Sequence, residues 1–226
     1  MLRKIIFPLL LGLAGCGVLI WLGLWQVDRL AWKQGIIANI NARIAADPQP
    51  FRTDVTEESD EYSSVTLSGA PTGEELHVLV SGTSAGTGYR VISRFETDDG
   101  LAIMLDQGLL RLEDKDAAPM VAPMQVTGTL LWPDDQNSST PDPDLDRNIW
   151  FARNVDTMAA ALDTLPLMVV VSQATPADPR ITALPVATAD IANDHLSYAI
   201  TWFLLAIVWA FMTLFLIRRT LRTKDI

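Results

Sequence analysis

The sequence contains one cysteine, Cys16, and only two histidines, His77 and His195. A single cysteine excludes an internal disulfide framework. The sequence also lacks C-x-x-C and H-E-x-x-H motifs and any paired His/Cys spacing, which argues against a conventional zinc or copper site. Clustered metal ligands are therefore not expected to carry the function.

Positive charge is also scarce, with 17 Lys and Arg against 27 Asp and Glu. Binding to nucleic acid is dominated by cations that neutralise phosphates, so we expect no nucleic-acid partner. The glycines of "GTSAG" (Gly82–Gly86) are not followed by Gly-Lys-Ser/Thr, which excludes a phosphate-binding loop of that type.

Charge is almost absent from two windows, Ile5–Trp25 and Leu196–Ile217. Each would be roughly 30 Å long as a helix, which matches the hydrocarbon core of a bilayer. Backbone groups in lipid must be hydrogen-bonded internally, so such runs are expected to be helical. We predict transmembrane helices over residues 5–25 and 195–217.

The short tails predict the orientation of these helices. Basic residues occupy both the N-terminus, residues 1–4, and the tail, residues 218–226: Arg3, Lys4, Arg218, Arg219, Arg222 and Lys224. Residues 28–195 instead carry 26 acidic and 11 basic side chains. The positive-inside rule therefore places both termini in the cytoplasm and the large loop in the periplasm. Without an Arg- and Ser-rich transit peptide, we expect a bacterial inner (plasma) membrane.

Cys16 ends the run "LAGC", which resembles a lipoprotein cleavage site. The apolar run continues after it as "GVLIWLGLW", where mature lipoproteins usually become polar. We therefore favour an uncleaved anchor whose small residues permit close helix contact, with lipidation of Cys16 as the alternative.

Helical periodicity continues beyond the first apolar window, through Leu30, Ile37, Ile40 and Ile44, until Pro48. This predicts an amphipathic stalk helix over residues 26–46. Aromatic rings and long cations anchor helices at a membrane interface, and such residues gather here: Trp21, Trp25, Arg29, Trp32 and Lys33.

Residues 47–194 are expected to form a β-rich periplasmic domain. Short β-branched runs predict strands at Tyr62–Gly69, Glu75–Ser81, Gly88–Glu96, Leu101–Leu112, Met124–Trp132 and Leu167–Gln173. Turns are predicted at Glu74-Glu75, Asp98–Gly100 and Glu113–Asp116. The fold class is thus a membrane protein of α+β type, in which two transmembrane helices flank an antiparallel β-rich exported domain with minor helices.

Two further segments of this domain have distinct signals. Pro133–Asn148 is rich in proline and acids and predicts a long exposed loop. We interpret its acids, Asp134–Asp146, first as a solvated charge run and second as a docking patch. Asn154 or Asp156 is then expected to cap a short helix that runs through Leu162 and ends before Pro166.

"GTSAG" also fits the G-x-S-x-G nucleophile elbow, with Ser84 as the nucleophile. That motif needs a helix after the serine and a later acid and histidine. A glycine-rich stretch and a strand pattern follow Ser84 instead, so we favour a hairpin connection over a hydrolase. His77 lies within a predicted strand, and we expect a solvent-facing or hydrogen-bonded strand histidine.

His195, Tyr198 and Trp202 fall at i, i+3 and i+7 on the second apolar helix, and Trp209 extends the same face. A neutral imidazole can ligate haem iron, and neighbouring aromatic rings can pack on a macrocycle. The same residue types also suit a membrane interface without a cofactor. The pattern alone leaves both interpretations open.

Two longer motifs favour the haem interpretation by resemblance. "GLWQVDRLAWKQGIIANINARI" (Gly23–Ile44) and "NDHLSYAITWFLLA" (Asn193–Ala206) resemble the ends of the two helices in the surfeit locus protein 1 family. "VTGTLLWPDD" and "NIWFARNVDTMA" lie between them in the expected order. The segment "DQGLLRLEDKD" (Asp106–Asp116) differs from the family's Arg-Gly-Trp pattern.

The resemblance implies a non-enzymatic assembly chaperone for cytochrome c oxidase, a haem-copper terminal oxidase of the respiratory chain. Such a protein binds haem a transiently and aids haem a insertion into the catalytic subunit, with haem a synthase as a second expected partner. The family's haem-linked histidine corresponds to His195, with Tyr198 and Trp202 beside it, and His195 would contact the iron. Trp25, Gln26, Arg29 and Trp32 match the first-helix signature. The main alternative is a structural accessory subunit that stays bound to a respiratory complex without contacting haem.

Overall fold

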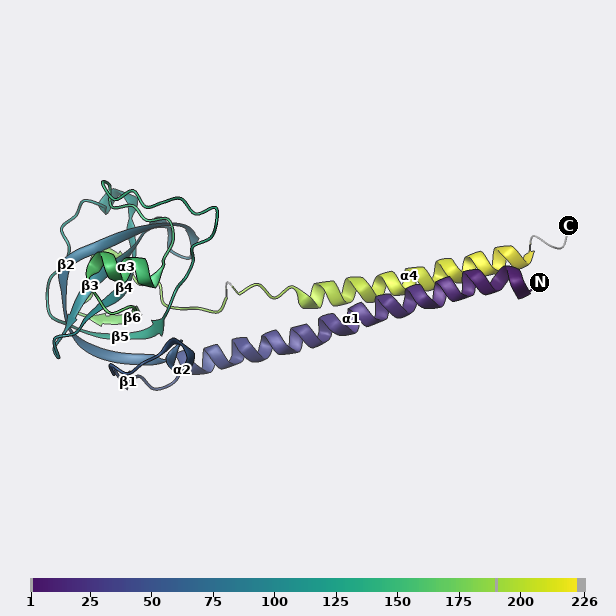
Figure 1. Cartoon of the computed structure of the whole chain (residues 1–226), viewed down its shortest axis with the longest axis horizontal. Helices are drawn as coiled ribbons and strands as arrows, with labels where there is room; N and C mark the ends of the chain where they lie inside the picture. Colours follow the sequence, from purple (N-terminus) through teal and green to yellow (C-terminus); the bar gives the residue numbers. More distant parts are fainter. Residues whose placement is uncertain (1, 190, 223–226) are drawn as a thin grey trace. The chain divides into compact units, whose positions relative to one another are not determined.

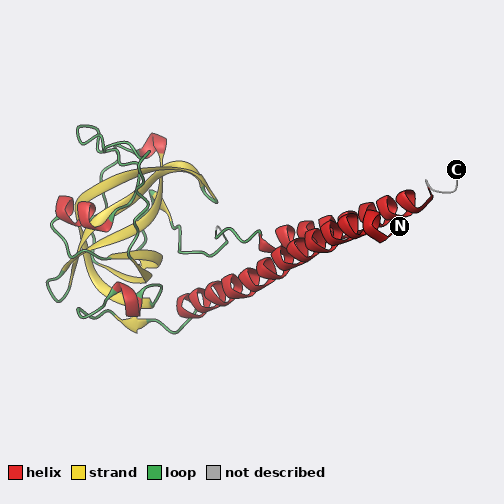
Figure 2. Cartoon of the chain, turned by 45° about the vertical axis from the view of Figure 1, so that its right-hand side comes forward, coloured by secondary structure: helices red, strands yellow, loops and turns green. Residues whose placement is uncertain are grey.

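The computed structural model describes residues 2–189 and 191–222. The chain divides into two compact units, one formed by Met1–Asn39 with Thr188–Ile226 and the other by Ile40–Ala187. The first is a pair of helices and the second is a β domain (Figures 1 and 2). This agrees with the fold class that the sequence predicts.

The helical unit consists of α1 (Leu2–Ile44), which continues into the β domain, and α4 (His195–Arg222). Both helices are long and apolar enough to cross a membrane by length and composition, and the most apolar 18-residue stretch of each has a mean hydropathy of 2.4. The sequence predicted a span followed by a stalk, and the structure shows one unbroken helix over both. Where the membrane ends along α1 stays a prediction.

The two helices run side by side in opposite directions (Figures 1 and 2). The contacts between them follow the antiparallel order, since Gly12 meets Thr213, Gly15 meets Trp209 and Gly23 meets Phe203. Ala199 and Ala206 are buried on the facing side of α4. Small residues thus bring the two backbones close together, as is usual in helix pairs within lipid.

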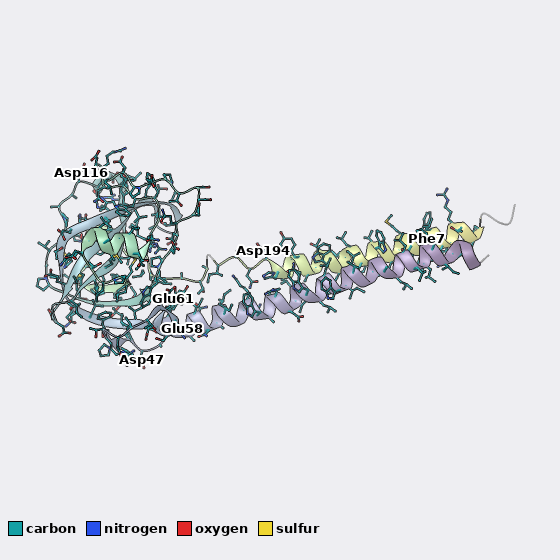
Figure 3. The ribbon with its side chains drawn as sticks, viewed as in Figure 1. Phe7, Asp47, Glu58, Glu61, Asp116 and Asp194 are labelled. Atoms are coloured by element: carbon teal, nitrogen blue, oxygen red, sulfur yellow. The ribbon has the colours of Figure 1, made fainter. Side chains whose placement is uncertain are left out.

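Most other side chains of the pair project outward (Figure 3), and Phe7, for example, is 72% exposed. An exposed apolar surface of this extent is unfavourable in water and matches a lipid environment.

The β domain is built on one sheet that closes on itself. Its strands are β1 (Gln49–Pro50), β2 (Ser64–Thr83), β3 (Gly86–Thr97), β4 (Ala102–Arg111), β5 (Met124–Leu131), β6 (Met168–Thr175) and β7 (Ile181–Thr182). The order β2-β3-β4-β6-β5 returns to β2, because β5 also pairs with β2. β7 pairs with β4, and β1 with β2. Closure leaves the five main strands with a partner on both sides.

The interior of this barrel is apolar and receives side chains from all five main strands, including Leu67, Phe95, Leu105, Val126 and Val169. The minor helices are α2 (Glu57–Asp60), a 3-10 turn at Leu112–Asp114 and α3 (Val155–Leu162). α3 covers a second apolar cluster on the barrel's outer side, with Met158 and Met168 at its centre.

Three details differ from the sequence prediction. The turn predicted at Glu74-Glu75 is wrong, because β2 continues through it as one strand with an irregular register between Pro71 and Glu75. Gly73, at φ +93, allows the chain to bend there without ending the strand. The β4–β6 and β1–β2 pairs are parallel, whereas an antiparallel domain was expected. The long connection through β5 and α3 permits the β4–β6 pairing.

Candidate functional site: the His195–Gln26 pair

His195 is the first residue of α4, and its side chain contacts α1. Its Nδ1 atom lies 2.8 Å from Oε1 of Gln26, which is 169 residues away in the sequence. The structure therefore joins two residues that the sequence had placed in separate motifs. The contact is part-buried.

The partner atom selects the tautomer that a neutral imidazole adopts. An amide oxygen only accepts hydrogen bonds, so Nδ1 of His195 donates to Oε1 of Gln26. In the neutral ring, Nε2 then carries the free lone pair. Histidines that ligate metals typically donate their second ring N–H to a fixed acceptor, which sets the tautomer and orients the ring. The pair thus has the arrangement of a single nitrogen ligand with its supporting acceptor.

The close approach of the helices places this pair. Phe203 lies where a Cβ on Gly23 would be, with Cε1 of the ring at 2.6 Å from that position. Gly23 lies one helical turn before Gln26, and Ala199, one turn after His195, is 2% exposed. Larger residues at these two positions would hold the imidazole away from the amide.

The predicted aromatic partners occupy different surroundings. Tyr198 is 56% exposed and points outward, whereas Trp202 is half-buried. Trp209 packs on α1 at Gly15. An apolar groove of about 540 Å³ lies between the helices near Gly12 and Thr213. That groove is about 20 Å along α1 from Gln26, so it does not adjoin the imidazole.

The predicted interface signature of α1 divides into two parts. Gln26 contacts His195, while Trp25, Arg29 and Trp32 form a cluster of their own. The Cζ atom of Arg29 lies 5.6 Å from the ring centroid of Trp25 and 5.4 Å from that of Trp32. The guanidinium is therefore held by cation–π contacts to both rings.

Within the β domain, the segment "NIWFARN" fastens the long acidic loop to the barrel. Asn148 donates to the Glu75 carbonyl at 2.8 Å, and the Trp150 N–H donates to the His77 carbonyl at 2.8 Å. Asn154 caps α3, where its Oδ1 accepts from the Thr157 N–H. This settles the alternative between Asn154 and Asp156, and it gives the motif a structural role.

Arg153 of the same segment reaches a buried carboxylate. Asp106 is fully buried on β4, 2.6 Å from Nη1 of Arg90 and 3.5 Å from Nη1 of Arg153. Burial raises the pKa of Asp106, although the two guanidinium groups favour its ionised form. The sequence treated Asp106 only as part of a divergent segment. An acid between apolar residues in a predicted strand was the available signal.

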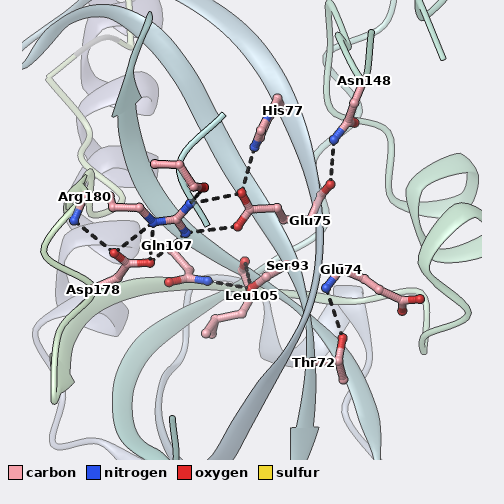
Figure 4. A network of polar contacts seen from close by, with 11 residues as sticks. Thr72, Glu74, Glu75, His77, Ser93, Leu105, Gln107, Asn148, Asp178 and Arg180 are labelled. Carbon is pink, nitrogen blue, oxygen red and sulfur yellow. Dashed lines mark hydrogen bonds and ion pairs between the residues drawn. The ribbon is translucent and has the colours of Figure 1, made fainter. Parts of the chain in front are cut away.

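His77 is buried, at 5% exposure, which excludes the solvent-facing alternative. Its Nε2 lies 2.9 Å from Oε1 of Glu75, and Arg180 bridges Glu75 to Asp178 (Figure 4). Burial disfavours the ionised form of both acids, but hydrogen bonds from His77 and Arg180 to Glu75 and from Arg180 to Asp178 outweigh it and hold the pKa of each below its ordinary value. This network joins β2 to the segment before β7 and was not predicted.

Ser84 lies in the turn between β2 and β3. A strand, and not a helix, follows it, so the hairpin prediction is confirmed and the nucleophile elbow is not formed. Within the described residues, no group of three or more His, Cys, Asp or Glu is arranged to hold a metal ion. The His195–Gln26 pair is therefore the site that the geometry favours.

Comparison with known proteins identifies the family of the chain. The model of the SURF1 family matches residues 13–207, which include both α1 at Gln26 and α4 at His195. The chain belongs to the SURF1 family. It is 27% identical over 221 residues to Surfeit locus protein 1 of Takifugu rubripes, covering 84% of this chain and 89% of that protein. It is 25% identical to the Homo sapiens protein of the same name, covering 80% of this chain and 68% of that protein. The SURF1-like protein of Drosophila melanogaster is 26% identical, with 84% and 71% covered.

Proposed function

We propose that this SURF1-family chain is an assembly factor for a haem-copper terminal oxidase. In this proposal it receives haem a at His195, holds it transiently and delivers it to the catalytic subunit of the oxidase. The observation that carries the proposal is the 2.8 Å contact between His195 and Gln26, which leaves one imidazole nitrogen free to bind iron.

The residues present fit a haem that would be held by one imidazole, that of His195. When bound, the haem supplies an iron that accepts an imidazole nitrogen as a ligand. Gln26 holds the His195 ring by Nδ1, and the half-buried Trp202 lies on the same helix two turns further on. The outward apolar surface of the helix pair provides surroundings in which a hydrophobic tail stays out of water.

A delivery role requires binding that is readily reversed. His77, the second histidine of the chain, belongs to the β domain, where Glu75 engages it. A single imidazole at the start of α4 would hold a haem less tightly than two histidine ligands would. The geometry therefore suits a carrier better than a permanent haem protein.

The proposal places α1 and α4 in a bacterial inner membrane, with both termini in the cytoplasm and the β domain in the periplasm. The support is the excess of basic residues in the two short tails and the length of the two apolar helices. A cysteine introduced at the exposed Ser139, in a Cys16→Ser background, should react with a membrane-impermeant maleimide in spheroplasts. Labelling only after lysis would contradict this orientation.

The acidic β domain is the proposed contact surface for the oxidase. Its exposed acids include Asp142 and Asp146 in the loop that Asn148 and Arg153 anchor to the barrel. A docking role predicts that recovery of assembly intermediates with the chain falls as salt rises.

The experiment that tests the function uses cells that lack the chain and express either the wild type or His195→Ala. The proposal predicts normal amounts of oxidase subunits but low haem a content in the catalytic subunit of the variant cells. Stoichiometric recovery of the chain with mature, active oxidase, and equal haem a content in both strains, would instead favour a structural accessory subunit.

A further inference from the structure

Two cations follow Gln26 on one face of α1. Gln26, Arg29 and Lys33 occupy positions i, i+3 and i+7, and residues at this spacing are neighbours along a helix. At a rise of about 1.5 Å per residue, Arg29 and Lys33 lie roughly 4.5 Å and 10 Å beyond Gln26 along the axis. We call these two residues the cation stripe.

Neither cation of the stripe has an acidic partner. Across residues 2–189 and 191–222, no carboxylate lies within ion-pair distance of Arg29 or Lys33. Asp28 is the single acid of α1, and its side chain is exposed. In the β domain, by contrast, arginines such as Arg90, Arg153 and Arg180 are bound to carboxylates. Arg29 and Lys33 thus place two positive charges without a carboxylate partner on the helix turns that follow Gln26.

Arg29 is also held in place. Trp25 and Trp32 contact its guanidinium at 5.6 Å and 5.4 Å, and such contacts engage the flat faces of the group. Among the residues that the structure describes, none accepts a hydrogen bond from its N–H groups, so the edge of the guanidinium can donate to a ligand. A guanidinium fixed in this way presents a fork that matches two oxygens of a carboxylate.

We propose that Arg29 and Lys33 bind the two carboxylates of the tetrapyrrole whose iron is held by His195. The inference rests on the proposed function. It names the residues that bind the carboxylate side of the haem whose iron His195 holds. A haem brings two carboxylates, whereas an imidazole that ligates iron is neutral and the Gln26 amide is uncharged, so the pair offers no counter-charge. Two charges left unpaired at the edge of a bilayer would oppose binding, and the stripe supplies one cation for each.

A phosphate of a membrane lipid also suits a guanidinium between two tryptophans. The spacing favours the carboxylates. Both cations lie on the same face of α1 as Gln26, and a site for a lipid phosphate would not need to share the face that contacts His195. The experiment below therefore distinguishes binding of porphyrin carboxylates from binding of a lipid phosphate.

The test measures affinity for a diacid and a diester porphyrin. The full-length chain in detergent micelles is titrated with iron protoporphyrin IX and with its dimethyl ester, which keeps the iron but lacks both carboxylates. The readout is the ratio of the two dissociation constants, obtained from the absorbance of the bound porphyrin. The variants are Arg29→Gln, Lys33→Gln, the double variant and His195→Ala. Arg218→Gln, which removes an equal charge at the other end of α4, is the matched control.

We expect the wild type and Arg218→Gln to prefer the diacid by about tenfold, and each single stripe variant to lose several-fold of that preference. The double variant should bind both porphyrins about equally. His195→Ala should weaken both and leave the ratio unchanged. An unchanged ratio in the double variant would overturn the inference, as would loss of co-purifying anionic lipid with the ratio preserved. Failure of the wild type to bind either porphyrin would overturn the proposed function itself.

Discussion

Gly12 packs directly against Thr213 on the opposite helix, so closely that a Cβ atom at residue 12 would overlap Cγ2 of the threonine. Thr213 cannot move aside easily, because its side chain is branched at Cβ and its hydroxyl donates to the Trp209 carbonyl at 2.8 Å. The separation of α1 and α4 is therefore set by the absence of a side chain at residue 12.

A Gly12→Leu substitution should separate the two helices and destabilise their association by about 1–3 kcal/mol. Gly17→Leu is the matched control, because a Cβ at Gly17 meets nothing within 4 Å. Thermal denaturation in micelles measures the difference. If both variants melt at the wild-type temperature, the helices do not pack through Gly12.

Arg180 holds two buried acids, and Arg180→Met should destabilise the β domain by about 3 kcal/mol or more at pH 7. The reason is that Glu75 and Asp178 would stay buried without their cation. Denaturant unfolding followed by far-UV circular dichroism measures the loss. Arg111→Met is the control, since the side chain of Arg111 is 69% exposed and its ion pairs lie at the surface.

The same network predicts a dependence on pH. The folded-state pKa values of Glu75 and Asp178 are lowered, so their contribution to stability is present above the unfolded pKa of about 4. It is lost as the pH falls below that value toward the folded-state pKa values. The stability difference between the wild type and Arg180→Met should therefore shrink in acid. A difference that stays constant from pH 7 to pH 3 would exclude this linkage.

Asn154 caps α3 and Asp156 does not, although either residue suits the sequence pattern. Asn154→Ala should therefore cost about 1 kcal/mol of folding free energy, and Asp156→Ala only about 0.3 kcal/mol from the helix dipole. Equilibrium unfolding of the two variants compares them directly. A larger loss in the Asp156 variant would contradict the observed cap.

The sequence predicted the parts of this fold that depend on local patterns. The two charge-free windows predicted the helices, because an apolar run of this length has few other stable conformations in lipid. The β-branched runs predicted all five main strands. The continuation of β2 through Glu74-Glu75 was missed, because acids next to a glycine indicate a turn unless the tertiary pairing with β3 overrides them.

The sequence predicted the residues of the candidate site but not the contact between them. Helical spacing and family resemblance identified His195 and Gln26 separately. The contact between these residues, which are 169 positions apart, depends on the register of the antiparallel pair α1 and α4. No local sequence pattern encodes that register. The sequence left open whether His77 is exposed or hydrogen-bonded and did not predict the burial of Asp106, since each belongs to a network that includes residues distant in the sequence.

Gln26 should strengthen haem binding because it orients the imidazole of His195. Gln26→Leu removes the acceptor of the Nδ1 proton and should weaken haem binding by about 10- to 100-fold. Gln26→Glu keeps an acceptor and should retain most of the affinity. Gln34→Leu, at an exposed position of the same helix, is the control. Equal affinities for Gln26→Leu and the wild type would show that the amide does not support the imidazole.

The most direct test of the haem carrier is the haem content of the chain itself. The wild type, His195→Ala and the control Thr201→Ala are purified from membranes of cells that make haem a, and bound haem is measured by absorbance and by extraction. The account predicts haem a with the wild type and the control, and its loss from His195→Ala. Equal haem content and identical spectra in all three would contradict it.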